Sequence, residues 1–253
     1  METLNTNKIL PITKNIGKYK INEYLGQNIY VIENIIEHKF CEEIINFIDT
    51  IPLQKTVYNN GNNVECFVGD LNSLLKENDD MYYSFSTNPE KLDKQTDNIY
   101  TNKINGVTKD EIVKYNGKIN EKMKIVAELM KEINNKIRLE HNTGYVLRKH
   151  YGATRTHIDG IPNIIKTNTT NNIHNKNVFK NTNMIRNTTC IFVLNDEFDG
   201  GVFSFGSSPY NISFKPKRGS IILFPPFWTH PHEVSAIDSP RYTVCSWSCE
   251  TIK

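Results

Sequence analysis

Short apolar runs separated by turn-forming residues fill the second half of the chain, and they constrain its fold more than any other feature. Strands are predicted at 188–194, 202–205, 211–214 and 220–224, with turns at Gly200-Gly201 and at 216–219. Strands that recur every eight to twelve residues or so are typical of β-sandwiches and barrels. We therefore predict an α+β fold whose core is a double-stranded β-helix, or jelly roll, with N-terminal supporting helices.

Two helices are expected outside this core. The segment 39–50 follows a predicted strand at 28–36 and buries one apolar face, and in 119–137 apolar residues recur at steps of four and three. Because no Gly/Ser-rich or Pro-rich linker divides the chain, we expect one domain at 26–253 with its core at about 139–250. Residues 1–25 would form an N-terminal extension.

Composition sets broad limits on partners and location. The chain has 30 basic and 28 acidic residues, a net charge of +2, so no nucleic-acid or membrane partner is expected. The first 15 residues lack the apolar centre of a signal peptide, and the 5 cysteines form no Cys-x-x-Cys motif. We expect a soluble, intracellular protein in the cytoplasm of its source or host cell. Its heavy use of Asn, Ile and Lys suggests an AT-rich genome, as in some giant viruses or protists. The oligomeric state is not predicted.

A His-x-Asp pair is the first chemical feature of the chain. On an extended segment, His157 and Asp159 project to the same side. A third ligand from far along the chain, His230 or His232, would complete one face of a metal and leave the opposite positions open, as in non-haem iron(II) oxygenases. With 7 histidines present, a single His-x-Asp pair is weak support on its own.

The last strand places further polar residues near this pair. A period of two puts Arg241, Thr243, Cys245 and Trp247 on one face. An inward-facing arginine needs an anionic partner, and its planar guanidinium suits a carboxylate bound through two hydrogen bonds. A dicarboxylic co-substrate that chelates iron at one end and meets Arg241 at the other would be such a partner.

These residues together resemble a known family. His157-x-Asp159, His232-Glu233-Val234, Arg241-Tyr242 and Trp247 are similar to the 2-oxoglutarate- and iron(II)-dependent dioxygenases, above all their prolyl hydroxylase branch, over about 139–250. The resemblance implies His157, Asp159 and His232 as ligands of Fe(II), with His232 preferred over His230. It also implies that Arg241 and Thr243 hold 2-oxoglutarate as co-substrate, with O2 as oxidant, and it leaves a need for ascorbate open.

Other site residues and the substrate follow from the same resemblance. Co-substrate contacts are expected from Trp247 and from a tyrosine on the strand 143–151, either Tyr145 or Tyr151. His174 lies in an Asn/Thr-rich insertion at 161–183 and is expected to be a solvated loop residue. A peptide or protein substrate, first of all a peptidyl proline, is implied. The alternatives are another residue type, a free amino acid or an alkylated base, and, in a different class, a non-catalytic jelly-roll binding module.

Overall fold

The computed structural model describes residues 9–24, 26–51, 53–57, 65–70, 109–139, 141–160, 165–167, 171–172, 182–207 and 210–251. Two helices lie in this part of the chain, α1 (His38–Thr50) and α4 (Lys109–Ile133). The strands that position the site are β3 (Ile29–Glu33), β7 (Val146–Tyr151), β8 (Thr154–His157), β11 (Thr182–Val193), β12 (Phe203–Ser207), β13 (Tyr210–Phe214), β14 (Ile221–Phe224), β15 (His232–Val234) and β16 (Arg241–Thr251). The others are β1 (Ile12–Ile16), β2 (Tyr19–Tyr24), β4 (Gln54–Val57), β5 (Glu65–Asp70), β6 (His141–Asn142), β9 (Ile165–Thr167) and β10 (Asn171–Asn172).

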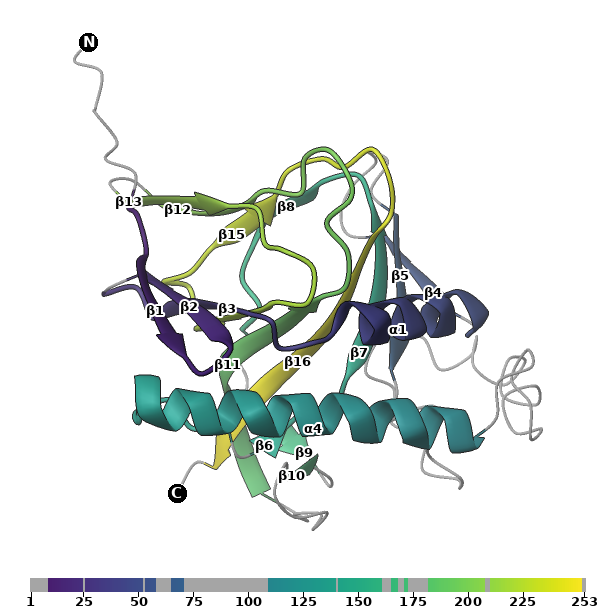
Figure 1. Ribbon diagram of the computed structural model, residues 1–253, viewed down its shortest axis with the longest axis horizontal. Helices are drawn as coiled ribbons and strands as arrows, with labels where there is room; N and C mark the ends of the chain where they lie inside the picture. The colour runs from purple at the N-terminus through teal and green to yellow at the C-terminus, as the bar shows by residue number, and fades with distance from the viewer. Residues whose placement is uncertain are drawn as a thin grey trace.

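The strands form a large sheet and a small one. The large sheet has the order β1-β2-β3-β14-β11-β16-β7-β5-β4, with β6, β9 and β10 at its margins, and the small sheet has the order β13-β12-β15-β8. In Figure 1 the small sheet lies at the top of the molecule, α4 runs across the lower part, and α1 lies above the right half of α4. This mostly β architecture is consistent with the predicted jelly-roll core.

Side chains alternate between two separate cores, one on each face of the large sheet. On β14, Ile221 and Leu223 belong to the core shared with α1 and α4, whereas Ile222 and Phe224 belong to the core shared with the small sheet. Because both faces of β14 are covered, all four residues are buried, which is why this strand is a continuous apolar run rather than an alternating one. The second core lies between the sheets, where β16 also contributes Cys245 and Trp247.

The predicted helices are present, but their bounds differ in accuracy. The helix expected at 39–50 is α1, one residue longer. The helix expected at 119–137 was wrong at both ends, because α4 begins at Lys109 and ends at Ile133. Its first turn carries Asp110 and Glu111, which favour a helix N-terminus, and Ile112 extends the buried stripe.

Several N-terminal supporting helices are not evident among the described residues. Only α1 lies before residue 109 in that part of the chain, and β1, β2 and β3 come first. Strands β1 and β2, which fall in the expected extension 1–25, pair with each other and then with β3, so they are joined to the large sheet.

The outer side of β16 is tied to α1 by a polar cluster. The Tyr242 hydroxyl donates to both carboxylate oxygens of Asp49 at 3.0 Å, and Lys149 Nζ, from neighbouring β7, lies 2.7 Å from Oδ1. Burial lowers the pKa of Lys149, but the partnership with Asp49 and Tyr242 outweighs it and raises the pKa above its usual value. The cluster holds the helix against the two strands that carry site residues on their other face.

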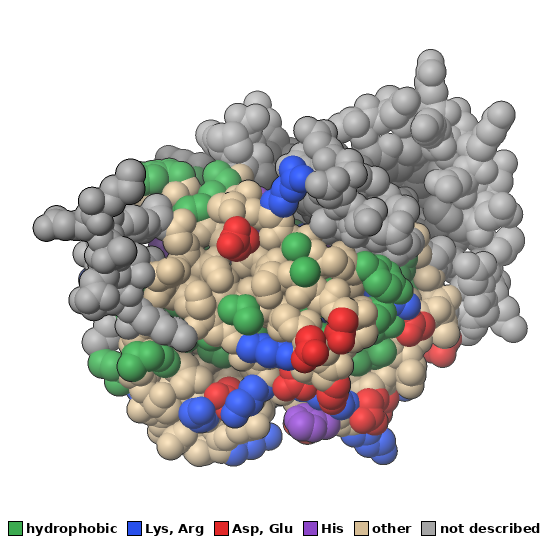
Figure 2. All heavy atoms as spheres, turned by 90° about the horizontal axis from the view of Figure 1, so that it is seen from above, with side chains coloured by type: hydrophobic (Ala, Val, Ile, Leu, Met, Phe, Trp, Pro, Cys, Tyr) green, Lys and Arg blue, Asp and Glu red, His purple; other side chains and the backbone are tan. Residues whose placement is uncertain are grey.

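The described surface shows mixed charge. On the face seen in Figure 2, acidic and basic side chains lie beside one another along one edge, and hydrophobic ones are scattered between them. Among the described residues, no helix is both long enough and apolar enough to cross a membrane.

Gly219 joins three elements by backbone hydrogen bonds. Its N–H donates to Val193 O at 2.8 Å, and its carbonyl accepts from the N–H groups of Ile35 and Ile36, both at 2.9 Å. Its φ is +78°, and a Cβ placed there would lie 2.4 Å from Ile36 O. The position therefore requires glycine for both its conformation and its close contact.

Gly219→Ala should lower the free energy of unfolding by at least about 2 kcal/mol more than Gly17→Ala. Gly17 also has positive φ, at +55°, but a Cβ there would meet nothing within 4 Å, so it reports the conformational cost alone. Urea unfolding followed by circular dichroism measures both variants. Equal decreases in the free energy of unfolding would show that a close contact with Ile36 O does not add to the cost of the substitution at Gly219.

Candidate functional site

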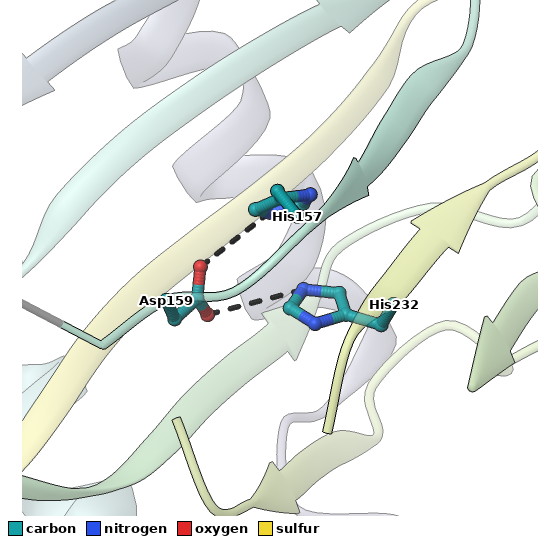
Figure 3. Close-up of side chains that lie close together, drawn as sticks. All are labelled: His157, Asp159 and His232. Atoms are coloured by element: carbon teal, nitrogen blue, oxygen red, sulfur yellow. Dashed lines mark ion pairs between the residues drawn. The ribbon is translucent and has the colours of Figure 1, made fainter. Parts of the chain in front are cut away.

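Two histidines and an aspartate converge at the edge where β8 and β15 pair. His157 ends β8, His232 begins β15, and the two residues are direct partners in the antiparallel register. Their ring centroids are 4.3 Å apart. Asp159 lies two residues beyond β8, and one potential ligand atom from each of the three residues lies within 4.8 Å of the others. Figure 3 shows the carboxylate of Asp159 facing both rings.

Backbone hydrogen bonds orient both rings in the same way. His157 Nδ1 lies 2.8 Å from Arg155 O, and His232 Nδ1 lies 3.1 Å from His230 O. A carbonyl oxygen only accepts, so each Nδ1 must carry the proton, and each neutral ring then presents the lone pair of Nε2. The two Nε2 atoms face Asp159, at 3.5 Å from Oδ1 and 4.0 Å from Oδ2. Two nitrogen donors and a carboxylate on one side are a complete facial set for a divalent metal.

The protonation states suit metal binding. Burial raises the pKa of Asp159, but the hydrogen bond with His157 and nearby positive charges outweigh it and hold the pKa well below its usual range. Burial lowers the pKa of His232 to about 4 despite the attraction of Asp159. For His157 burial is outweighed by Asp159, so its pKa is raised. At neutral pH the site offers an ionised carboxylate and at least one neutral imidazole.

The triad opens onto a cavity between the sheets. Its empty volume is about 350 Å³, part of it open to solvent. Arg241 and Thr243 line it, as expected from the face that they share on β16, and they are only 5% and 2% exposed. The guanidinium of Arg241 lies 5.3 Å from the ring centroid of Phe203 in the small sheet. A buried cation in the wall of a cavity suits an anionic ligand.

The two tyrosines predicted on the strand 143–151 do not reach this cavity. Tyr145 packs into the core on the helix side, where its hydroxyl donates to Asn120 Oδ1 on α4 at 2.7 Å. Tyr151 is on the same side of β7 as Lys149, whose Nζ lies 5.9 Å from the Tyr151 ring. The expectation that either tyrosine contacts the co-substrate is therefore corrected.

The opposite face of β7 supplies residues that sequence reasoning missed. Arg148 and His150 line the cavity, and they lie directly across from Thr243 and Arg241 on β16. Alternation along β7 separates two faces but does not say which one is inward. The register with β16 was the missing information, because it places Arg148 beside a residue already assigned to the inner face.

His230 is held away from the triad. Its Nε2 lies 2.5 Å from Gln27 O, and its Nδ1 lies 2.8 Å from Thr229 Oγ1. Both ring nitrogens are thus used in local hydrogen bonds, and the geometry agrees with the choice of His232. His174, with most of the insertion 161–183, lies outside the described residues.

Trp247 lies beside the cavity rather than in its lining. Its ring is buried between two arginines. The guanidinium of Arg186, on β11, lies 4.1 Å from the ring centroid, and that of Arg148, on β7, lies 5.4 Å from it. Trp247 thus shares the predicted face of β16 with Arg241, but its contacts are with two arginines.

A bulge in β11 brings Arg186 to this position. The register with β16 shifts between Arg186 and Thr188, so Asn187 is an extra residue. Without it, Arg186 would face the helices with Cys190 and Phe192. With it, Arg186 Nη1 donates to Asp159 O at 3.1 Å. This bond fixes the backbone of Asp159, which no strand holds.

Comparisons with known proteins agree with this geometry. Residues 145–249 match the model of the 2OG-Fe(II) oxygenase superfamily. The chain is similar to a solved prolyl hydroxylase from Trichoplax adhaerens in complex with a hypoxia inducible factor peptide fragment, with TM-score 0.53, 12% identity, and 88% and 84% of the two chains covered. It is also similar to a 2OG-Fe(II) oxygenase family oxidoreductase from Burkholderia pseudomallei, with TM-score 0.52, 11% identity, and 88% and 85% covered.

Identities this low establish similarity of fold alone. No curated protein matches the chain. The resemblance to the 2-oxoglutarate- and Fe(II)-dependent superfamily, predicted from the sequence, is confirmed over the segment that holds the triad and Arg241.

The metal-free protein should become less stable as pH falls from 7 to 5. The pKa of His232 is lowered to about 4 and that of His150 is also lowered, so in this window the unfolded chain binds protons that the folded chain does not. His157, with a raised pKa, offsets part of the loss. His232→Gln should remove roughly 1–2 kcal/mol of the pH dependence. Urea unfolding at both pH values with chelator present tests this, and a pH dependence that is the same in His232→Gln and in the wild type would contradict the prediction.

Arg186→Gln should weaken Co²⁺ binding at the triad by about ten-fold or more, because the Asp159 backbone loses its charged hydrogen-bond donor. Arg186→Lys keeps the charge and should recover part of the affinity. Calorimetric titration measures the affinity for Co²⁺, with Lys136→Gln as a control that removes an exposed positive charge. Unchanged affinity in Arg186→Gln would rule out the positioning role.

Proposed function

We propose that this chain is a 2-oxoglutarate- and Fe(II)-dependent dioxygenase with a jelly-roll core and a single domain at 26–253, and that it hydroxylates a peptidyl proline. The observation that carries the proposal is the pair of imidazoles, fixed through Nδ1 to backbone carbonyls, whose Nε2 atoms face one ionised carboxylate. The superfamily match covers the same residues.

The donor set fits the metal that the superfamily uses. His157 and His232 supply nitrogen and Asp159 supplies oxygen, which suits Fe(II) and leaves positions free on the side of the cavity. When bound, iron(II) supplies the redox chemistry that couples oxidation of 2-oxoglutarate to succinate and carbon dioxide with hydroxylation of a substrate C–H bond by O2. The chain's own contribution is to bind, orient and shield the reactants.

Arg241 and Thr243 are assigned to the far carboxylate of 2-oxoglutarate. Both side chains are buried and line the cavity from one face of β16, so a carboxylate there would meet a guanidinium and a hydroxyl in a site shielded from water. Charge-assisted hydrogen bonds of this kind are worth about 1.5–3 kcal/mol. Phe203 and Val234 form an apolar wall of the same cavity and limit the entry of water.

The choice of substrate has narrower support than the choice of co-substrate. The segment from His232 to Arg241 resembles prolyl hydroxylases, and the Trichoplax protein of similar fold was solved with a peptide fragment. These two observations favour a prolyl residue in a peptide over a free amino acid or an alkylated base. A non-catalytic binding module would keep the fold without turnover.

The activity is tested by succinate release from 2-oxoglutarate under air with Fe(II), alone and with proline-rich peptides. Asp159→Ala should lower succinate release at least about a hundred-fold, because the metal loses its carboxylate ligand. Arg241→Gln should raise the KM for 2-oxoglutarate about ten-fold or more. The matched controls are Asp199→Ala and Arg138→Gln, at exposed positions.

An inactive wild-type protein that still binds the peptides would support the binding module instead. Full activity in Asp159→Ala would remove that residue from the ligand set.

A further inference from the structure

An exposed apolar surface lies beside the triad, and the proposed chemistry does not use it. Among the described residues six large hydrophobic side chains are exposed, and three of them, Ile158, Phe227 and Trp228, are on two short segments next to metal ligands. Ile158 directly precedes Asp159, and Trp228 lies four residues before His232. Trp228 is 79% exposed, the highest fraction of the six. Large apolar side chains gathered at one place on a surface indicate a binding site, whereas scattered single ones need no explanation.

The two segments that carry these side chains are in contact. A Cβ placed on Gly160 would lie 2.7 Å from Pro226 O and 3.7 Å from Phe227 Cα. The backbone next to Asp159 therefore packs directly against the backbone that leads into Trp228. A molecule bound to the exposed apolar surface would lie beside the candidate metal centre.

The turn that presents Trp228 is held from behind. The N–H of His230 donates to Phe227 O at 2.9 Å, which closes a β-turn with Trp228 and Thr229 at its two central positions. His230 Nε2 lies 2.5 Å from Gln27 O, so the turn is tied to the loop between β2 and β3. Because the backbone is already ordered, binding to the indole ring costs little further conformational freedom.

The size of the surface favours a short segment of a peptide over a second copy of this chain. At their partial exposures the three side chains offer on the order of 300–400 Å², whereas a stable dimer buries roughly 800 Å² on each partner. The three side chains carry no charge, so they select for apolar area. Extended segments that contain proline also dock on exposed aromatic rings.

We propose that Ile158, Phe227 and Trp228 bind an apolar residue of the peptide substrate, next to the prolyl residue that is hydroxylated. The assignment rests on the proposed function. Trp228 exposes the most apolar area and is the specificity-determining residue. The triad acts on the target residue, and this surface selects its neighbour, so a leucine beside the proline is preferred over a serine.

Tryptophan fluorescence tests the surface without turnover. The chain has 2 tryptophans and Trp247 is buried, so acrylamide should quench mainly Trp228. On Zn²⁺-loaded protein, a peptide with one central proline between leucines should lower this quenching about two-fold or more, because it covers the indole ring. Its Kd, measured by calorimetry, should be about ten-fold lower than that of the same peptide with serines. Failure of the leucine peptide to bind, or binding that leaves the quenching unchanged, would overturn the proposal.

Substitutions test the role of the ring. Trp228→Ala should reduce the preference for the leucine peptide to about two-fold or less, and Trp228→Phe, which keeps an aromatic ring, should reduce it by about three-fold at most. The matched control is Val113→Ala, at an exposed apolar position on α4, on the other side of the large sheet. An unchanged preference in Trp228→Ala would overturn the proposal. The quenching of the wild type remains a test if Trp228→Ala does not fold.

Sedimentation distinguishes a second copy as the occupant. The wild type and Trp228→Ala should sediment alike. A wild-type dimer that dissociates in Trp228→Ala would assign the surface to self-association and overturn the proposal.

Succinate release separates this proposal from the proposed function. The leucine peptide should stimulate the wild type more than the serine peptide does, and the difference should disappear in Trp228→Ala. Peptide binding that protects Trp228 without any succinate release would keep the surface and reject the oxygenase. Turnover that is the same with both peptides and in Trp228→Ala would keep the oxygenase and reject the surface.

Discussion

The pairing of β8 with β15 is the interaction on which the site depends. It makes His157 and His232 cross-strand neighbours, so two residues far apart in sequence gain a fixed relation through a backbone ladder rather than through flexible side chains. The carbonyls of Arg155 and His230 then select the same tautomer for both rings. The carboxylate of Asp159 faces both rings from the irregular segment that follows β8. A preorganised donor set of this kind needs little rearrangement to take a metal.

The two faces of the large sheet have different roles: one packs against the helices and the other lines the cavity. On one face it packs against α1 and α4 and carries the cluster of Tyr242, Asp49 and Lys149. On the other face, neighbouring residues of the same strands, Arg241 and Arg148, line the cavity. Because the period is two, each residue that stabilises the helix layer is next in the chain to one that faces the ligand space. Packing against the helices therefore also restrains the strands whose other face lines the cavity.

Sequence patterns were informative where one local rule decides the outcome. The apolar face of 39–50 and the continuous apolar run at 220–224 gave elements close to those observed. The shared face of Arg241 and Thr243 also followed from alternation alone. The start of α4 at Lys109 was missed because most residues of its first two turns are polar, and Ile112 is the one buried residue between 110 and 118.

Other features depend on pairings between distant strands. The inward face of β7 is decided by its register with β16, so Arg148 and His150 could not be distinguished from Tyr145 and Tyr151 by pattern. The bulge at Asn187 has no strong local signal either. These are the places where tertiary contacts, not local propensity, select the conformation.

The irregularity at Asn187 gives β11 two phases. Downstream of it, even-numbered residues such as Cys190 and Phe192 point to the helices, and upstream of it Arg186 lies on the opposite face, where it contacts Asp159 O. The single extra residue, Asn187, therefore reverses which face of the sheet the odd- and even-numbered side chains of β11 point to. An insertion or deletion of one residue at this point would move every side chain on one side of it to the opposite face of the sheet. Insertions and deletions are therefore better tolerated in the turns that join the strands than within β11.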